Sequence, residues 1–296
     1  MEGWTMGIRL TRVRLPQRIA VQVSGLYGVL YIHYGVLAFL PLWLKSRDVP
    51  ITQIGALLAI PLFLRLIAVA PVVAWAGRRG RLRDALTLFT VLSAALAAST
   101  GLITDHLYLL IVFSMFSLAW DQLPVLADAY AVLAVRARNL DFGRLRVWGS
   151  IGVIAGAALG GAVFQIGGIG LLPWLAGALL MLMAVVSRLV PPDSKLMSPD
   201  EQRVPGDWKA VFADRQMMAA MIATSLVAGS HGVLQSFSAI QWEGQGWSTG
   251  TVGSLTAVGI ASEMVILVFG QKWLKAADPR WLILFGAIAA VLRWIG

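Results

Sequence analysis

The sequence predicts an all-α membrane protein with two helical halves, the second of which the chain contains only in part. Of its 296 residues, 58% are hydrophobic and 13% are charged, whereas soluble domains carry about 25% charged residues. Uncharged stretches of about 18 residues or more recur along the chain, each long enough to cross a ~30 Å hydrocarbon core. These stretches are apolar on all sides, unlike the roughly 10-residue alternating strands of a membrane barrel, so they are predicted to be helices.

The apolar stretches define the expected membrane-spanning helices in chain order. Nine are predicted, at 19–44, 51–76, 85–104, 107–133, 143–166, 169–190, 216–241, 249–271 and 280–296. The ninth is interrupted by the end of the chain.

Basic residues gather in alternate loops, which predicts the orientation of the helices. The N-terminal tail and the loops after the second, fourth, sixth and eighth helices hold nearly all of them, whereas the other loops hold Lys45 and Arg47. The N-terminus is therefore expected in the cytoplasm. The formal charge of +9 is explained by these loops, so no nucleic-acid partner is expected. The absence of cysteine excludes disulfides and thiolate metal sites within this sequence.

A polar segment divides the chain into two unequal parts. Residues 1–190 are predicted to form a six-helix half, 191–215 a cytoplasmic linker and 216–296 the start of a second half. Gly55 and Gly253 lie in similar short runs and differ by 198 positions, which suggests a parallel repeat. By that repeat the chain ends inside the helix equivalent to the third. A fragment is therefore expected, and an unusual nine-helix protein is the alternative.

Ionisable side chains inside the predicted spans are the candidate functional residues, because each costs at least about 2.5–3.5 kcal/mol at the bilayer centre. Asp128 and Arg146 lie symmetrically about residue 137, in the turn between the fourth and fifth helices, so they are expected at equal depth. A carboxylate–guanidinium pair is predicted there, either static or responsive to substrate and protons. The full set is Arg65, Asp121, Asp128, Arg146, Glu263 and Arg293, with His33 and His231 as titratable neutral groups.

The repeat suggests a second pair. Arg65 and Glu263 also differ by 198 positions, so they are expected to form or break an ion pair as the halves move; alternatively, each pairs within its own half. Asp121 lies seven residues before Asp128 and shares its helix face, unless it bonds locally. His231 is a candidate proton acceptor or ligand donor, or else a packing residue.

Two further patterns bear on function. Gly152, Gly156 and Gly160 form a ridge at four-residue spacing that predicts close helix packing. No nucleotide-binding loop, zinc-protease motif or nucleophile elbow is present in the sequence, which argues against an enzyme and against an ATP-driven pump. A membrane-embedded enzyme would need a clustered catalytic motif. A transporter-like receptor would need a soluble signalling domain.

The run from Phe142 to Ser150, FGRLRVWGS, resembles the fifth-helix signature of the phenylpropionate, nucleoside and lactose permease branch of the major facilitator superfamily. The stretches 236–242 and 291–294 resemble the phenylpropionate permeases as well. The resemblance implies the major facilitator fold, a bacterial inner-membrane location and a monomer that acts on a small molecule and protons, with no cofactor. The loop 77–81 departs from the superfamily pattern because it lacks the usual preceding aspartate.

The resemblance also implies roles for individual residues. Asp128, Arg146 and Arg293 match substrate-binding positions, and Glu263 matches a position involved in proton coupling. With His231 added to the binding group, and Arg65 and Asp121 to the coupling group, these residues form the candidate site. The expected activity is proton symport of an aromatic carboxylate such as 3-phenylpropionate, and the alternative substrate is a nucleoside or sugar.

Overall fold

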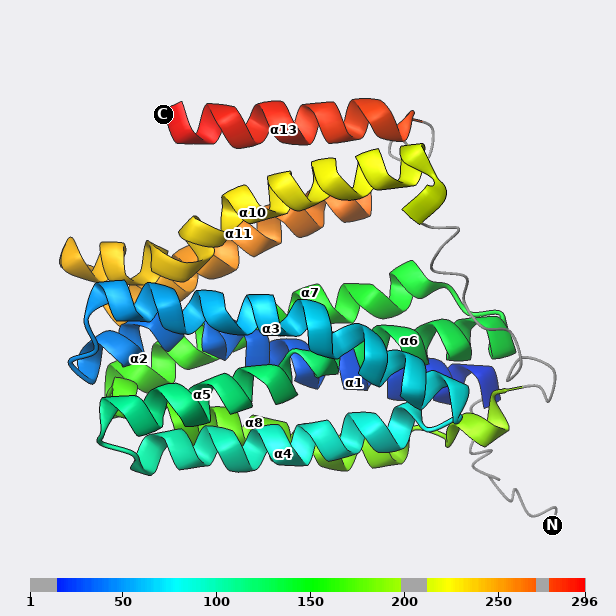
Figure 1. Cartoon of the computed structure of the whole chain (residues 1–296), viewed down its shortest axis with the longest axis horizontal. Coiled ribbons are helices and arrows are strands. Elements are labelled where there is room, and N and C mark those ends of the chain that lie inside the picture. The colour runs from blue at the N-terminus through cyan, green and yellow to red at the C-terminus, as the bar shows by residue number, and fades with distance from the viewer. Residues whose placement is uncertain (1–14, 198–211, 270–276, 296) are drawn as a thin grey trace, which may run out of the picture.

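A computed structural model describes residues 15–197, 212–269 and 277–295, and within these ranges it contains helices and no strand (Figure 1). The first eight helices are α1 (Leu15–Leu37), α2 (Leu40–Ser46), α3 (Ile51–Arg78), α4 (Leu82–Leu102), α5 (His106–Trp120), α6 (Gln122–Arg138), α7 (Phe142–Gly167) and α8 (Leu172–Leu189). The later helices are α10 (Arg215–Gly244), α11 (Thr249–Phe269) and α13 (Pro279–Ile295), and short 3₁₀ turns cover Ile169–Leu171 and Asp193–Lys195. The all-α prediction is confirmed.

Six helical segments of the described chain are long and apolar enough to cross a membrane, and α3 makes a seventh if its two bent parts count as one span. Two of these segments combine a pair of helices, namely Gln17–Ser46 and His106–Arg138. The last two predicted spans form helices α11 and α13 but fall outside this count. In α13 the described apolar part is Arg280–Leu292, which is too short for the usual ~20-residue span.

Prolines explain why three of the predicted spans are broken or bent. A proline ring clashes with the carbonyl four residues earlier and has no N–H to donate. For Pro41 that carbonyl belongs to Leu37, the last residue of α1, and for Pro124 it belongs to Trp120, the last residue of α5. For Pro71 it belongs to Ile67, where α3 resumes after a bend of 41°. Asp121 therefore lies in the turn between α5 and α6 and not inside a continuous helix.

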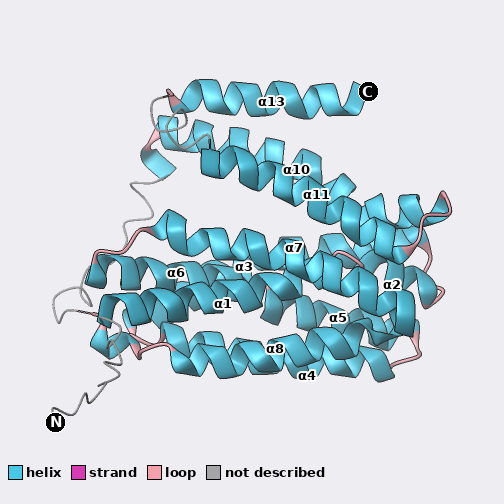
Figure 2. Cartoon of the chain, turned by 180° about the vertical axis from the view of Figure 1, so that it is seen from behind, coloured by secondary structure: helices cyan, strands magenta, loops and turns pink. Residues whose placement is uncertain are grey.

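The helices lie side by side along the long axis of the molecule (Figure 1). One end, which we call the basic end, carries the loops 79–81 and 139–141 and the C-terminus of α8; the opposite end carries α2. Both views show α10 and α11 close to the first eight helices near α2 and diverging from them toward the basic end (Figures 1 and 2). Contacts of α10 with α2 and of α11 with α7 join the two groups.

The glycine ridge of α7 packs closely against a neighbouring helix, as predicted, and that helix is α1. A Cβ atom at Gly152 would lie 2.5 Å from the carbonyl oxygen of Gly28, and one at Gly156 would overlap the backbone of Ile32. The two backbones can therefore approach this closely only because both positions lack a side chain. This contact fixes α1 against the helix that carries Arg146.

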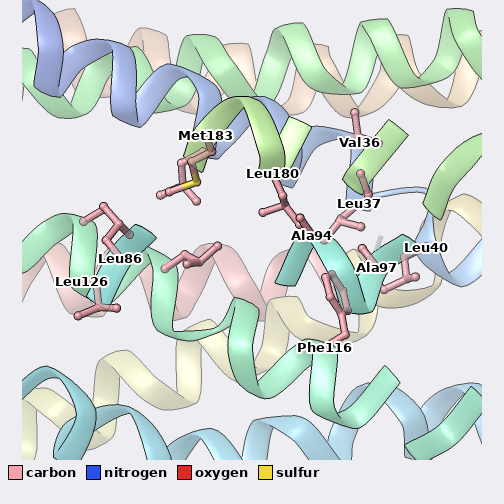
Figure 3. Packing of buried hydrophobic residues seen from close by; sticks show 14 of the residues in the cluster. Val36, Leu37, Leu40, Leu86, Ala94, Ala97, Phe116, Leu126, Leu180 and Met183 are labelled. Carbon is pink, nitrogen blue, oxygen red and sulfur yellow. The ribbon is translucent and has the colours of Figure 1, made fainter. Parts of the chain in front are cut away.

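The apolar core of the first eight helices lies between α1, α4, α5, α6 and α8 (Figure 3). Leu86 of α4, Leu126 of α6 and Met183 of α8 are buried in it, and Phe116 of α5 packs beside Ala97. Helix α1 contacts α6, α7 and α8. It is thus the central helix of this group, and its tyrosines reach Asp128 and Arg146.

Candidate substrate and coupling site

Three tyrosines on α1 form a ladder that runs along one face of the helix. Tyr27, Tyr31 and Tyr34 recur at spacings of four and three residues, which places them on one face. The Tyr27 and Tyr31 ring centres are 6.2 Å apart and those of Tyr31 and Tyr34 are 5.3 Å apart. Trp120 of α5 extends the ladder, with its ring centre 4.6 Å from that of Tyr34.

Asp128 is held by the first rung of this ladder. The Tyr27 hydroxyl donates a hydrogen bond of 2.6 Å to the Asp128 carboxylate, and the Tyr27 ring is fully buried. The predicted direct pair between Asp128 and Arg146 is wrong, because the two side chains are not within ion-pair distance of each other. Both residues contact Tyr27 of α1 instead, Asp128 through the hydroxyl and Arg146 through the ring.

Arg146 is held by the rings of the ladder. Its guanidinium carbon lies 4.2 Å from the Tyr31 ring centre and 5.5 Å from that of Tyr27, distances typical of cation–π contacts. Its Nη2 donates to the Tyr31 hydroxyl at 2.7 Å. Among the described residues, no carboxylate forms an ion pair with Arg146.

Arg65 pairs with Asp121, within the first eight helices. The Arg65 Nη1 and Asp121 Oδ1 atoms are 3.7 Å apart, with the Asp121 side chain 6% exposed and that of Arg65 40% exposed. Of the two alternatives for Arg65, the structure therefore supports a partner in its own half. Arg65 is the last residue before the bend in α3, and Asp121 lies in the turn between α5 and α6.

The remaining candidates belong to the later helices. His231 of α10 is half-buried, and its Nδ1 lies 2.9 Å from the carbonyl oxygen of Val227 and 3.2 Å from the Ser230 hydroxyl, both on its own helix. Glu263 and Arg293 are placed on α11 and α13. Their side chains lie outside the described part of the structure, so their predicted roles stay predictions.

The tyrosines are the residues that sequence reasoning missed. An uncharged ring in an apolar run has no desolvation cost that marks it as functional, yet Tyr27 contacts both Asp128 and Arg146. Tyr31 contacts Arg146 as well. Their spacing on one face was the available signal. His33 is buried, with its ring centre 5.9 Å from that of Trp120 and 6.3 Å from that of Tyr34. Neither of its nitrogens has a hydrogen-bond partner among the described residues.

The arrangement combines two kinds of chemistry. Arg146 offers a guanidinium between aromatic faces, which suits a ligand that has both an anionic group and an apolar ring. Asp128 and Asp121 add two carboxylates, one held by a tyrosine hydroxyl and the other by the Arg65 guanidinium. These groups lie on α1, α3, α6 and α7 and at the α5–α6 turn, within one helical group.

Comparisons with known proteins agree with this fold. The profile of the MFS_1 like family matches residues 4–296. A probable 3-phenylpropionic acid transporter of Escherichia coli strain K12 is 27% identical over 274 residues, covering 90% of this chain and 71% of that protein. The crystal structure of the nucleoside transporter NupG matches with a TM-score of 0.68 at 14% identity, covering 87% of this chain and 68% of NupG. A mutant of NupG matches with a TM-score of 0.66 at 15% identity.

The bundle of apolar helices with charges held in its interior is that of a multi-pass membrane transporter. The chain belongs to the MFS_1 like family, and its fold is that of the major facilitator superfamily.

Proposed function

We propose that the protein is a proton-coupled symporter of a small organic solute, with an aromatic carboxylate such as 3-phenylpropionate as the first candidate. The observation that carries this proposal is the state of Arg146, whose guanidinium lies on two tyrosine rings and forms no ion pair with a described carboxylate. Such a group can bind a carboxylate through two parallel hydrogen bonds. The tyrosine ladder beside it offers an aromatic surface for a phenyl ring.

The relative from Escherichia coli supports the same substrate class, since its printed name is a probable 3-phenylpropionic acid transporter. A nucleoside is the second candidate, because the rings of the ladder can stack on a base. The two candidate substrates differ in charge at neutral pH. An acid needs Arg146 as a cation, whereas a neutral nucleoside needs only hydrogen bonds there.

Uptake into membrane vesicles tests the substrate. Vesicles carrying the product of the complete open reading frame should accumulate labelled 3-phenylpropionate, and Arg146→Gln should abolish this while Arg144→Gln, an exposed neighbour on the same helix, should leave it nearly unchanged. Uptake of labelled uridine without uptake of 3-phenylpropionate would favour the nucleoside alternative.

We assign proton coupling to the Arg65–Asp121 pair and to Glu263, as the sequence suggested. We assign it also to Asp128, which the sequence placed with the substrate-binding residues. The geometry supports this for Asp121, a buried carboxylate with one guanidinium partner, and for Asp128, whose hydrogen-bond donor is a neutral tyrosine. A protonophore should abolish accumulation of substrate. Asp128→Asn should retain exchange of labelled for unlabelled substrate but lose accumulation driven by a pH gradient, and accumulation that survives in this variant would contradict the assignment.

The basic loops support an inner-membrane protein with a cytoplasmic N-terminus, and we propose that it acts as a monomer. Reporter proteins fused after Arg79 and after Thr104 would test the orientation. The first fusion should be active in the cytoplasm and the second outside it.

A further inference from the structure

Asp128 and Arg146 share a neighbour on α1, Tyr27. The two residues leave the same turn on adjacent antiparallel helices, and opposite charges at equal depth attract strongly where water is scarce. They nevertheless form no ion pair. Tyr27 of α1 contacts both, through its hydroxyl to Asp128 at 2.6 Å and through its ring to the Arg146 guanidinium at 5.5 Å.

The hydroxyl and the ring of Tyr27 act on different partners. An O–H···O distance of 2.6 Å is in the range of charge-assisted hydrogen bonds to an ionised carboxylate. The single hydroxyl proton of Tyr27 is therefore committed to Asp128. The ring is packed edge-to-face against Phe142, with centres 6.5 Å apart, and is fully buried, so packing holds Tyr27 in contact with both residues.

The guanidinium of Arg146 is meanwhile directed to Tyr31. It donates to the Tyr31 hydroxyl at 2.7 Å and lies over the Tyr31 ring. These neutral partners orient Arg146 but do not neutralise it. The positive charge thus stays available to an anionic ligand.

We propose that Tyr27 is a positioning residue that keeps the Asp128 carboxylate away from Arg146 and so preserves Arg146 as the receptor for a substrate carboxylate. This inference rests on the proposed function for the identity of the ligand. Without the hydroxyl, Asp128 loses its donor and turns to Arg146, where it competes with the substrate. Tyr27 therefore affects the affinity for the substrate indirectly, through Asp128 and Arg146.

Binding of 3-phenylpropionate to the purified product of the complete open reading frame tests the role. Tyr27→Phe should weaken the apparent Kd about tenfold, the scale of one competing charge-assisted contact. The double variant Tyr27→Phe/Asp128→Asn should recover most of that loss, because the competing carboxylate is gone. Tyr108→Phe is the matched control, since Tyr108 is exposed on α5, and its Kd should not change. A failure of Asp128→Asn to rescue would reduce Tyr27 to a packing residue.

A second measurement is independent of the substrate. The reactivity of Arg146 with phenylglyoxal, followed on its own peptide by mass spectrometry, should fall several-fold in Tyr27→Phe, because a guanidinium paired with a carboxylate is less available. Unchanged reactivity would overturn the proposal. Asp128→Asn alone should leave the reactivity of Arg146 unchanged, and increased reactivity would show that Asp128 already pairs with Arg146. This measurement can be made even if Tyr27→Phe does not fold.

The two measurements separate the possible failures. If the wild-type protein does not bind 3-phenylpropionate but Tyr27→Phe lowers the reactivity of Arg146, the proposed substrate is wrong and the role of Tyr27 stands. If 3-phenylpropionate binds but neither Kd nor reactivity responds to Tyr27→Phe, the proposed function stands and the role of Tyr27 is refuted.

Discussion

Lys45 and Glu243 form an ion pair between the first eight helices and the later ones, with 2.6 Å between Nζ and Oε2. Lys45 is near the end of α2 and Glu243 near the end of α10. The two residues are 198 positions apart, the same separation as Gly55 and Gly253 in the predicted repeat. If the halves are related by a twofold pseudo-symmetry axis, equivalent residues can touch only close to that axis. The pair thus marks where the two helical groups meet at the α2 end.

Reversing the charges of this pair should show whether it holds the α2 end closed. Lys45→Glu or Glu243→Lys alone should slow substrate uptake by about two- to fivefold, because each side chain is 40% exposed and exposed pairs are worth roughly 0.2–1 kcal/mol. The double reversal Lys45→Glu/Glu243→Lys should restore the rate. The measurement is initial uptake into vesicles. Asp48→Asn is the control nearby, and equal defects in the single and double variants would contradict a direct interaction.

The Arg65–Asp121 pair leads to a prediction about stability. Arg65→Gln should lower the melting temperature of the detergent-purified protein, since it leaves the buried Asp121 carboxylate without its ionic partner. We expect a loss of about 1–3 kcal/mol, less than for a fully buried pair because Arg65 is partly exposed. The double variant Arg65→Gln/Asp121→Asn should be more stable than Arg65→Gln alone. A double variant that is less stable than both singles would show that the residues act separately.

The helices could be predicted from the sequence because each apolar run carries its own signal in composition and length. The pairing of the charges could not. Depth in the membrane follows from the rise per residue, and it correctly placed Asp128 and Arg146 near each other. The rotation of each helix and the identity of the helix that packs against both depend on tertiary packing, so the contacts of Tyr27 with Asp128 and Arg146 were not predictable from the hairpin alone.

The repeat offset of 198 positions likewise could not predict which charges pair. It suggested Arg65 and Glu263 as partners, but Arg65 pairs with Asp121, at a turn that Pro124 introduces. The same offset does relate Lys45 to Glu243, which form an ion pair. An offset identifies equivalent positions, and only those near the symmetry axis are in contact.

The α1–α7 contact predicts which glycines tolerate a side chain. Gly156→Ala should destabilise the protein by more than about 2 kcal/mol or prevent its folding, because the added Cβ would overlap the backbone of Ile32 and the helices would have to separate. Gly25→Ala on α1 is the matched control, since a Cβ there meets nothing within 4 Å and alanine favours the helix. Thermal unfolding in detergent measures both. Equal melting temperatures for the two variants would show that the helices do not pack this closely.

The carboxylate of Asp193 connects the segment after α8 to the N-terminus of α4 at the basic end. Asp193 is buried and accepts hydrogen bonds from the backbone N–H groups of Leu82 at 2.6 Å and Arg83 at 3.1 Å. Asp193 thereby caps the N-terminus of α4, a position at which a negative charge is favoured. Nearby, the Tyr130 hydroxyl donates to the Pro191 carbonyl at 2.6 Å, so the segment is attached to α6 as well as to α4.

Asp193→Asn should lower the free energy of unfolding by about 1 kcal/mol, because the amide keeps only one acceptor oxygen and loses the charge at the helix N-terminus. Asp48→Asn is the comparison, since Asp48 is exposed and asparagine tolerates its positive φ of 57°. Thermal unfolding gives the size of the effect. Hydrogen exchange at the amides of Leu82 and Arg83 locates it, because these two should exchange faster in Asp193→Asn and not in Asp48→Asn. Unchanged exchange at both amides would mean that α4 begins without help from Asp193.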